Sequence, residues 1–368
     1  MSLELSMEEW KKQNGEFMAR DYGLPAATGS RSKSVSRGSD SFLATHTGRA
    51  ARNEFRPVPI SLLGPSQPVD WLTKGLVGGG YMTLLAAFAK TGKTTFLTHL
   101  LRDWERGGPL AEQQLEKPVL VVSEESSGHW MRRRDSLALG DGTHLELIPF
   151  MGRPNLSEWE QLIADIESQI KGGAEYAAVV FDTLASLWPV TEENDAGAVS
   201  SAIMPLRRLT EAGAAVILVH HTRKGDASEG RASRGSGALP AMVDIIVELR
   251  RFAAHNARDT RRVLTSFGRF DESEPELVID LQDEGYVIVG DRARATEEDR
   301  ITAIRELLNS HGQLTVDRIY DMWPNDLKPS RRTLAYDLNV GAERDLWTRL
   351  GTGKRGDPFH FARIEHPA

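Results

Sequence analysis

The feature that most constrains the fold of this chain is the stretch from Tyr81 to Leu97. An apolar run over residues 81–88 predicts a buried strand, and the turn Ala89-Lys90-Thr91-Gly92 follows it directly. Lys93 then opens a segment in which apolar residues recur at helical spacing. A buried strand that passes through a short turn into a helix is the unit from which α/β folds are built.

This strand–turn–helix unit has the geometry of a phosphate-binding loop, because free N–H groups and the helix dipole meet an anion at the helix start. Lys93 would reach the β- and γ-phosphates, and Thr94 would offer its hydroxyl to Mg²⁺. We therefore expect ATP and Mg²⁺ as ligands. An ordinary turn is the alternative, since Ala87 stands where the usual pattern has its first glycine. The residues predicted to bind the nucleotide are Ala89, Lys90, Thr91, Gly92, Lys93, Thr94 and Thr95.

Composition excludes several classes of protein. The chain has 368 residues, is 40% hydrophobic and 26% charged, and contains no cysteine, so disulfides and thiol chemistry are excluded. It has no apolar run of 18 residues and no apolar N-terminal segment, so we expect a cytoplasmic protein without a membrane partner. The net charge of −7 excludes a uniformly basic DNA-coating protein, and any contact with nucleic acid must come from local patches.

Three regions are expected. Residues 1–56 are predicted to form a flexible basic N-terminal tail, because the stretch 31–52 is rich in Ser, Gly and Arg. Residues 57–292 alternate strand and helix patterns, which predicts an α/β fold with a mostly parallel sheet covered on both faces. Residues 296–368 form a smaller domain. The strands expected in the sheet cover residues 81–88, 118–122, 145–150, 176–183, 214–221 and 241–249, with shorter ones at 262–267, 276–281 and 286–289.

Ligands of such a sheet bind at the carboxyl ends of its strands, and chemically suitable residues stand at those ends. Asp182 ends an apolar strand and is the expected partner of Mg²⁺. Glu125 or Glu124, after the second strand, would polarise the attacking water. One histidine of the pair His220-His221 would sense the γ-phosphate. Together with the loop, these residues predict a hydrolytic site.

Five segments of the chain carry a recognisable pattern in a fixed order, and they are 87–95, 121–127, 179–184, 218–222 and 233–238. This order resembles the RepA-like branch of RecA-type AAA ATPases, which is similar to the DnaB-type hexameric replicative helicases. The resemblance covers about residues 57–290, and it implies a RecA-like P-loop core and a homo-oligomer in the form of a hexameric ring.

The resemblance also assigns individual roles. It implies that Glu125 rather than Glu124 is the catalytic glutamate, and that His221 is the γ-phosphate sensor. The segment 265–270 looks like the element that inserts an arginine into the neighbouring subunit's site, which makes Arg269 the candidate and Arg262 the reserve. Residues 223–234 fall where such motors place a DNA-contacting loop.

The C-terminal region predicts three helices followed by a hairpin, an order that resembles a winged helix. Thr296 starts a capping-box pattern for the first helix, and further helices are expected over 314–320 and 329–338. The third helix begins with basic residues and is the candidate for the major groove, with Lys354-Arg355 at the tip of the wing. Winged helices also serve as protein-docking modules, so the partner of this domain stays open between DNA and protein.

The function that we expect is that of an ATP-hydrolysing P-loop ATPase acting on DNA, similar to a replicative helicase of a plasmid, phage or mobile element. One alternative is an ATP-gated DNA-binding regulator or loader that does not unwind DNA processively. A second alternative is an ATPase without a nucleic-acid substrate, whose winged helix docks onto protein.

Overall fold

The computed structural model describes residues 57–364 except for 58, 63, 64, 66, 222–236, 254, 255, 257, 274, 275 and 325–327. The predictions for the tail (1–56) and for the DNA-contacting segment (223–234) lie outside the described residues. The chain divides into two units, residues 1–68 and 69–368. In the first unit the described part contains a 3-10 turn, η1 (Ile60–Leu62). The second unit carries the sheet and the C-terminal domain.

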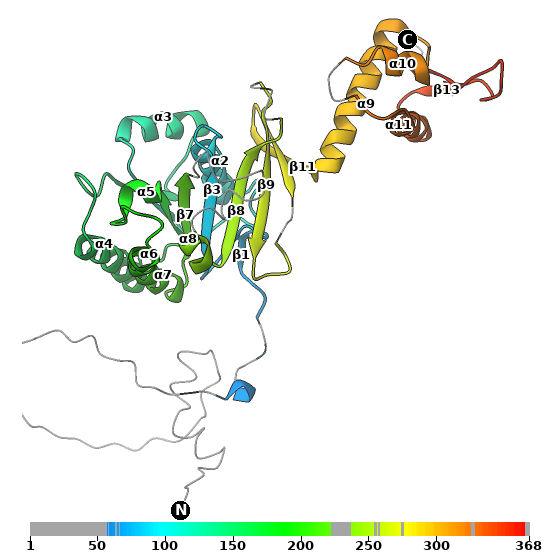
Figure 1. The fold of residues 1–368 in the computed structure, drawn as a ribbon. Coiled ribbons are helices and arrows are strands. Elements are labelled where there is room, and N and C mark those ends of the chain that lie inside the picture. Colours follow the sequence, from blue (N-terminus) through cyan, green and yellow to red (C-terminus); the bar gives the residue numbers. More distant parts are fainter. Residues whose placement is uncertain are drawn as a thin grey trace, which may run out of the picture. The chain divides into compact units, whose positions relative to one another are not determined.

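A nine-stranded sheet forms the centre of the second unit, in the order β11-β10-β9-β8-β3-β7-β6-β4-β5 (Figure 1). The six strands from β8 to β5 run parallel, and β9, β10 and β11 extend the sheet in antiparallel fashion. The prediction of an α/β fold with a mostly parallel sheet is therefore confirmed. The strands are β3 (Met82–Ala87), β4 (Val119–Ser123), β5 (Thr143–Leu147), β6 (Ala178–Asp182), β7 (Ala215–His221), β8 (Ile245–Arg251), β9 (Arg261–Gly268), β10 (Leu277–Gln282) and β11 (Gly285–Gly290).

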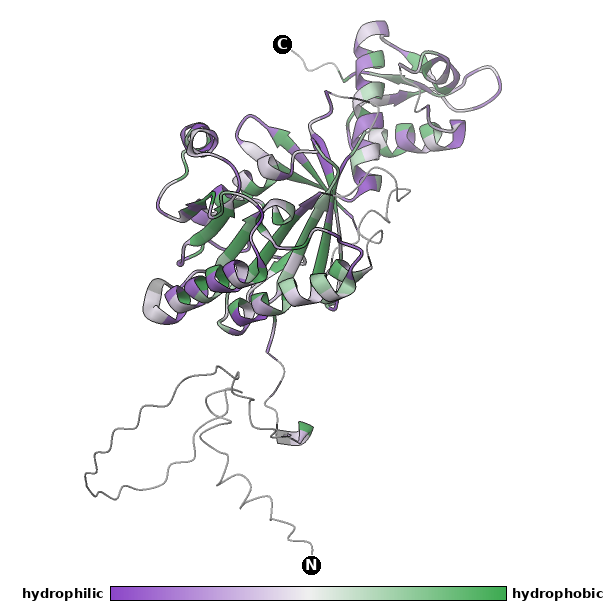
Figure 2. Ribbon diagram, turned by 60° about the vertical axis from the view of Figure 1, so that its left-hand side comes forward, coloured by the Kyte–Doolittle hydropathy of each residue, from purple (hydrophilic) through white to green (hydrophobic). Residues whose placement is uncertain are grey.

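Helices cover both faces of this sheet, and the period of two in each strand divides the core between them (Figures 1 and 2). Leu85 and Val121 pack on the face covered by α2 and α3, whereas their neighbours Leu84 and Leu120 pack on the face covered by α4 to α8. Such strands are apolar throughout because both of their faces are buried. The helices are α2 (Lys93–Arg106), α3 (Ser127–Leu137), α4 (Leu156–Gln169), α5 (Leu184–Leu187), α6 (Ala196–Ile203), α7 (Arg207–Glu211) and α8 (Ala238–Met242).

Several predicted boundaries of the core were wrong. Ahead of the first predicted strand, β1 (Trp71–Thr73) pairs with β2 (Val77–Gly78). The strand expected at 241–249 begins only at Ile245, because α8 occupies the residues before it. Pro205 lies in a 3-10 turn, η3 (Met204–Leu206), which separates α6 from α7.

The C-terminal domain has a core of its own. Three helices pack against a three-stranded antiparallel sheet of order β12-β14-β13, and their shared core includes Trp347 and Phe361. The second helix is shorter than predicted, because Leu314 and Thr315 form a strand that precedes it. The elements are α9 (Arg292–His311), β12 (Leu314–Thr315), α10 (Val316–Asp321), α11 (Arg331–Glu343), β13 (Thr348–Leu350) and β14 (His360–Ala362).

Helix α9 begins five residues earlier than the capping box predicted. Asp291 is the N-cap, and its side chain accepts a hydrogen bond from the Arg294 amide. Thr296, the residue expected to cap, lies within the helix and donates its hydroxyl to the Arg292 carbonyl. The helix therefore begins against the sheet, ahead of the C-terminal domain.

Candidate active site

Four adjacent strands end side by side and carry the residues that the sequence singled out. Ala87 of β3 is in register with His221 of β7, and Ser123 of β4 is in register with Asp182 of β6. Strand β7 lies between β3 and β6 in the sheet. The carboxyl ends of these strands therefore form one edge, which is where ligands of α/β sheets bind.

In the turn between β3 and α2, the residues with positive φ come after position 87, where the usual phosphate-loop pattern has its first glycine. Ala87 is the last residue of β3, buried and extended, so a glycine is not required there. Lys90 and Gly92 have positive φ angles of 62° and 103°. Helix α2 then starts at Lys93 without a side-chain cap, which leaves its first amides for another acceptor.

Lys93 lies inside this turn and is buried. Its ammonium group donates to the carbonyls of Ala87 at 3.1 Å and Phe88 at 3.3 Å, and it lies 2.7 Å from Nδ1 of His221. An ammonium group has no acceptor, so the imidazole must be neutral with Nδ1 accepting. Burial lowers the pKa of His221, and the charge of Lys93 lowers it further. Burial also lowers the pKa of Lys93 to about 8, although the charge of Asp182 opposes the shift.

Asp182 is a buried carboxylate that receives no hydrogen bond from the part of the chain that the structure describes. Its side chain is 2% exposed, and among the described residues neither of its oxygens has a hydrogen-bond donor. Burial, followed by the charge of Glu125, raises its pKa to about 6. A buried carboxylate that lacks donors is destabilising unless it serves a ligand.

Mg²⁺ would supply a positive partner for the oxygens of Asp182. Asp182 offers two unpaired oxygens, and Thr94 is half-buried at the first turn of α2. Hard oxygen ligands of this kind suit Mg²⁺, which is held in proteins by one or two side chains together with phosphate and water. The residues present therefore fit a magnesium ion bound with a nucleotide.

Two glutamates follow β4, and each already has a partner. The carboxylate of Glu125 accepts hydrogen bonds from both terminal nitrogens of Arg133, and the bond from Nη2 is 2.9 Å long. This bond to Arg133 lowers the pKa of Glu125, so the carboxylate is ionised at neutral pH. Glu124 accepts a hydrogen bond of 2.8 Å from the Thr183 hydroxyl. The negative charges of both glutamates raise the pKa of Asp182, so both lie near this carboxylate.

The two arginines considered for insertion into a neighbouring subunit's site lie at opposite ends of strand β9. Arg269 follows β9, is 67% exposed and lies 3.7 Å from Asp244 at the start of β8. The Asp244 amide donates to the Met82 carbonyl, and Met82 stands one strand length, about 20 Å, from the loop. Arg269 therefore cannot reach the loop of its own chain. Arg262, the reserve, donates to the Thr91 carbonyl of its own loop at 2.8 Å.

The sequence analysis placed Lys93, Asp182 and His221 at the carboxyl ends of the strands, where the structure has them. It missed two residues that contact the glutamates of the site. Arg133 was not among the residues singled out from the sequence. Its spacing from Trp130, over whose ring its guanidinium lies at 4.9 Å, places both on one face of α3. Thr183 follows Asp182 directly, and its hydroxyl was not considered as a partner for Glu124.

Comparison with known proteins agrees with this architecture. Residues 50–227 match the family model of an AAA domain. The chain is 26% identical over 247 residues to a DNA repair protein RadA of Brucella abortus (strain 2308), covering 65% of this chain and 49% of that protein. It is 27% identical over 256 residues to the DNA repair protein RadA of Mycobacterium tuberculosis (strains CDC 1551 / Oshkosh and H37Rv), covering 68% and 47%.

The chain thus spans about half the length of the curated relatives that it matches. The family match and the sheet together support a RecA-like core of the P-loop ATPase superfamily. The narrower resemblance to the RepA-like branch stays a prediction. In the part of the chain that the structure describes, no helix is long and apolar enough to cross a membrane.

The burial of the Asp182 carboxylate leads to a prediction about the free energy of unfolding. Because folding raises the pKa of Asp182 from 3.8 to about 6, the folded state binds more protons over that range, and stability is lost as the pH rises through 6. Asp182→Asn should therefore raise the free energy of unfolding of the nucleotide-free protein at pH 7.5, by up to about 3 kcal/mol. The gain should disappear as the pH falls to 4.

Urea unfolding of both proteins at a series of pH values measures this difference. Asp244→Asn is the control, because the Asp244 carboxylate accepts a hydrogen bond of 3.0 Å from the Met82 amide and should gain nothing from neutralisation. An Asp182→Asn protein that is less stable than the wild type at pH 7.5 would contradict the assignment.

Proposed function

We propose that this protein is an ATP-hydrolysing P-loop ATPase that acts on DNA, in a cytoplasmic setting. The observation that carries the proposal is the gathering of Lys93, Glu125, Asp182 and His221 at four aligned strand ends around one glycine turn. Phosphoryl transfer needs positive charge, an oriented water and a metal-binding carboxylate. At this edge Lys93 would supply the charge, Glu125 would orient the water, and Asp182 would bind the metal.

Each side chain has a separate task in this proposal. Lys93 would exchange its neutral acceptors for the β- and γ-phosphate oxygens. Thr94 and Asp182 would hold Mg²⁺, which would neutralise phosphate charge. Water attacks the γ-phosphorus, its proton passes to the Glu125 carboxylate, and the bond to the bridging oxygen breaks to leave ADP and phosphate. His221, bonded to Lys93 before the nucleotide binds, responds to the γ-phosphate because that bond is then lost.

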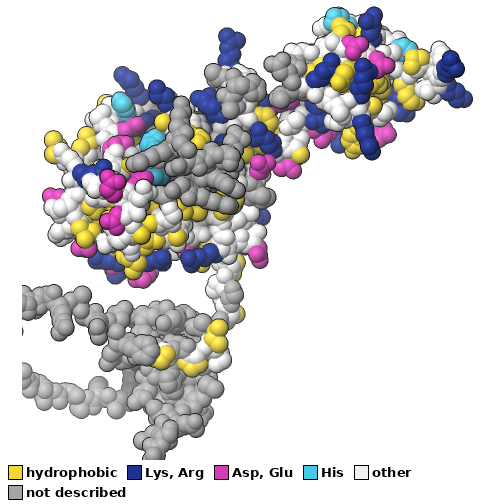
Figure 3. Space-filling model, viewed as in Figure 1, with side chains coloured by type: hydrophobic (Ala, Val, Ile, Leu, Met, Phe, Trp, Pro, Cys, Tyr) yellow, Lys and Arg dark blue, Asp and Glu magenta, His cyan; other side chains and the backbone are white. Residues whose placement is uncertain are grey.

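Two observations support DNA as the partner. The similar proteins bear the name DNA repair protein RadA, and the C-terminal domain exposes basic side chains (Figure 3). Its helix α11 presents Arg332 and Tyr336 on one exposed face, at the spacing of one helical turn. This arrangement suits a winged-helix-like domain that places α11 in the major groove.

The finer proposal is a RepA-like replicative helicase that works as a hexameric ring. It is supported by the position of Arg269, which is exposed and distant from its own loop and so is free to enter the site of a neighbouring subunit. The regulator or loader is the second candidate within the DNA-acting class. Strand displacement that depends on a single-stranded tail separates it from the helicase.

ATP turnover by the full chain, with and without single-stranded DNA, tests the proposal. We expect DNA to stimulate turnover, and we expect Lys93→Ala to lower kcat/KM for ATP by at least about a hundredfold. Hydrolysis that is indifferent to DNA would reject the DNA-acting readings and favour an ATPase with a protein-docking domain. Particle mass measured on the same sample tests the ring.

Substitution of the two glutamates tests the choice of base. Glu125→Gln should keep ATP binding and lose turnover, because the amide cannot accept the proton from water. Glu124→Gln is the matched control, since it neutralises the adjacent acid whose contact is with Thr183. If Glu124→Gln instead loses turnover and Glu125→Gln does not, the assignment of the base is reversed.

Mixing of variants tests the arginine. Arg269→Ala subunits keep an intact loop, and Lys93→Ala subunits keep an intact arginine. If Arg269 acts on the neighbouring subunit, the mixture should recover part of the ATPase activity that each variant lacks alone. Titration of one inactive variant with the other measures the recovery, and an inactive mixture of assembled rings would exclude action in trans.

A further inference from the structure

Two arginines of the hairpin β8–β9 hold the phosphate loop from outside. Arg251, at the end of β8, and Arg262, at the start of β9, are cross-strand partners. Arg251 donates to the Lys90 carbonyl at 3.1 Å, and Arg262 donates through Nε to the Thr91 carbonyl at 2.8 Å. The two successive carbonyls before Gly92 are therefore bound by one element that lies far from the loop in sequence.

This hold has a consequence for the amides of the loop. The C=O and N–H groups of a trans peptide point in opposite directions. When Arg262 binds the Thr91 carbonyl, the amide of Gly92 is therefore directed away from the hairpin. The guanidinium is itself fixed, because Nη1 donates to the carbonyls of Asp259 at 3.0 Å and Arg261 at 2.7 Å. It also lies against Gly92, where a Cβ atom would be 3.8 Å from Nε.

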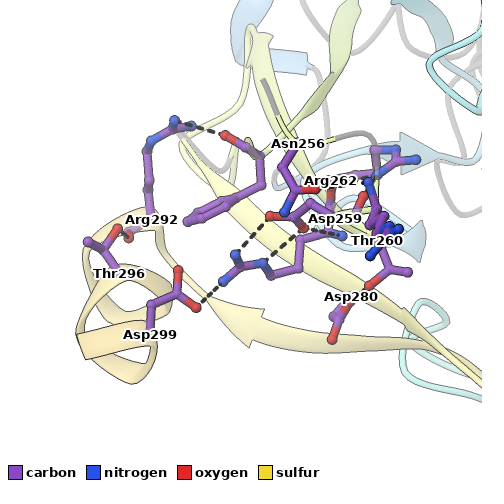
Figure 4. A network of polar contacts seen from close by, with 11 residues as sticks. Asn256, Asp259, Thr260, Arg262, Asp280, Arg292, Thr296 and Asp299 are labelled. Carbon is purple, nitrogen blue, oxygen red and sulfur yellow. Dashed lines mark hydrogen bonds and ion pairs between the residues drawn. The ribbon is translucent and has the colours of Figure 1, made fainter. Parts of the chain in front are cut away.

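The next residue, Arg261, faces the other side of the hairpin, because side chains alternate along a strand. Its guanidinium donates to the Asp259 carboxylate at 2.8 and 3.1 Å. It also donates to the Asp299 carboxylate of α9 at 2.6 Å (Figure 4). Arg261 and Arg262 thus connect α9 to the phosphate loop through adjacent residues of one strand.

The start of α9 is seated on the same hairpin by apolar contacts. Ala295 is fully buried in a cluster with Phe252, Val263 and Val278. Arg292 donates to the Phe252 carbonyl at 3.1 Å, and its guanidinium lies 5.0 Å from the centre of that ring. The first turns of α9 are therefore packed directly on the hairpin.

The far end of α9 belongs to the C-terminal domain. Ile304 and Leu308 are buried in the core of that domain, and Arg300 binds the buried carboxylate of Asp337. The sequence from Arg292 to His311 contains neither glycine nor proline, so the helix runs without a break for about 30 Å. A single rigid element thus joins the C-terminal core to the hairpin.

We propose that Arg262 is a positioning residue that holds the phosphate loop ready for the nucleotide, and that Asp299 of α9 strengthens this hold through Arg261. The proposal rests on the proposed function, because it assigns the loop to ATP. It makes nucleotide affinity, rather than the chemical step, dependent on the hairpin and on the helix of the C-terminal domain.

Binding of the fluorescent analogue mant-ATP with Mg²⁺ to the full chain, at low ionic strength, tests the hold. Arg262→Gln should raise the Kd about tenfold, and Arg262→Lys, which keeps the charge and a donor, about threefold. Under saturating ATP, kcat should change less than twofold in both. Arg258→Gln is the matched control, because it removes the same charge from an exposed position on the same hairpin.

The link to α9 is tested by a double-mutant cycle. Asp299→Asn should raise the Kd about threefold in the wild type and leave it unchanged in Arg262→Gln. Glu298→Gln is the control, because Glu298 is the neighbouring acid of α9, and its partner is Arg294 of the same helix. Equal effects of Asp299→Asn and Glu298→Gln would overturn the link.

The outcomes separate the inference from the proposed function. If the wild-type chain neither binds mant-ATP nor hydrolyses ATP, the proposed function fails and the inference fails with it. If the wild type does both and Arg262→Gln binds with unchanged affinity, the inference alone is overturned. Thermal unfolding identifies a variant that does not fold, in which case Arg262→Lys decides, and an unchanged Kd for that variant overturns the inference.

Discussion

The structure of the candidate site depends on two opposite charges buried without a direct bond between them. Lys93 is held by two carbonyls and a neutral imidazole, and among the described residues Asp182 has no donor at all. Burial shifts the pKa of each toward neutrality, to about 8 and about 6. Such an arrangement is costly in the free protein, and it would become favourable if the proposed phosphate and divalent cation completed the set of charges.

The sheet makes this arrangement possible because it fixes position without using the functional side chains. Backbone pairing sets the register of β3, β7, β6 and β4, and apolar residues on both faces bury the strands. Asp182 and His221 stand at the last step of the pairing, and Lys93 and Glu125 follow in the segments just beyond it. A rigid scaffold can therefore keep a destabilising site in place, which is common where function opposes stability.

The contrast between a scaffold set by local pattern and contacts set by packing explains what could be predicted from the sequence. Apolar runs and strand ends depend on local pattern, so the parallel sheet and the placement of Lys93, Asp182 and His221 were accessible. The contacts of Arg133 and Arg262 depend on which elements meet in space, and no local pattern encodes that. The start of α9 was misplaced because Thr296 and Asp291 both carry cap-forming side chains, and packing of Ala295 on the hairpin favours the earlier one.

The arginines around the loop also bear on how the charge of a γ-phosphate is balanced. Arg133 is engaged by Glu125, and Arg262 is engaged by backbone carbonyls, so each would have to leave an acceptor to meet the phosphate. Arg269 is exposed but lies one strand length away from its own loop. An additional cation from a neighbouring subunit would stabilise the transition state without breaking either contact. The contacts within one chain are therefore compatible with the proposed assembly, in which a second chain would supply that cation.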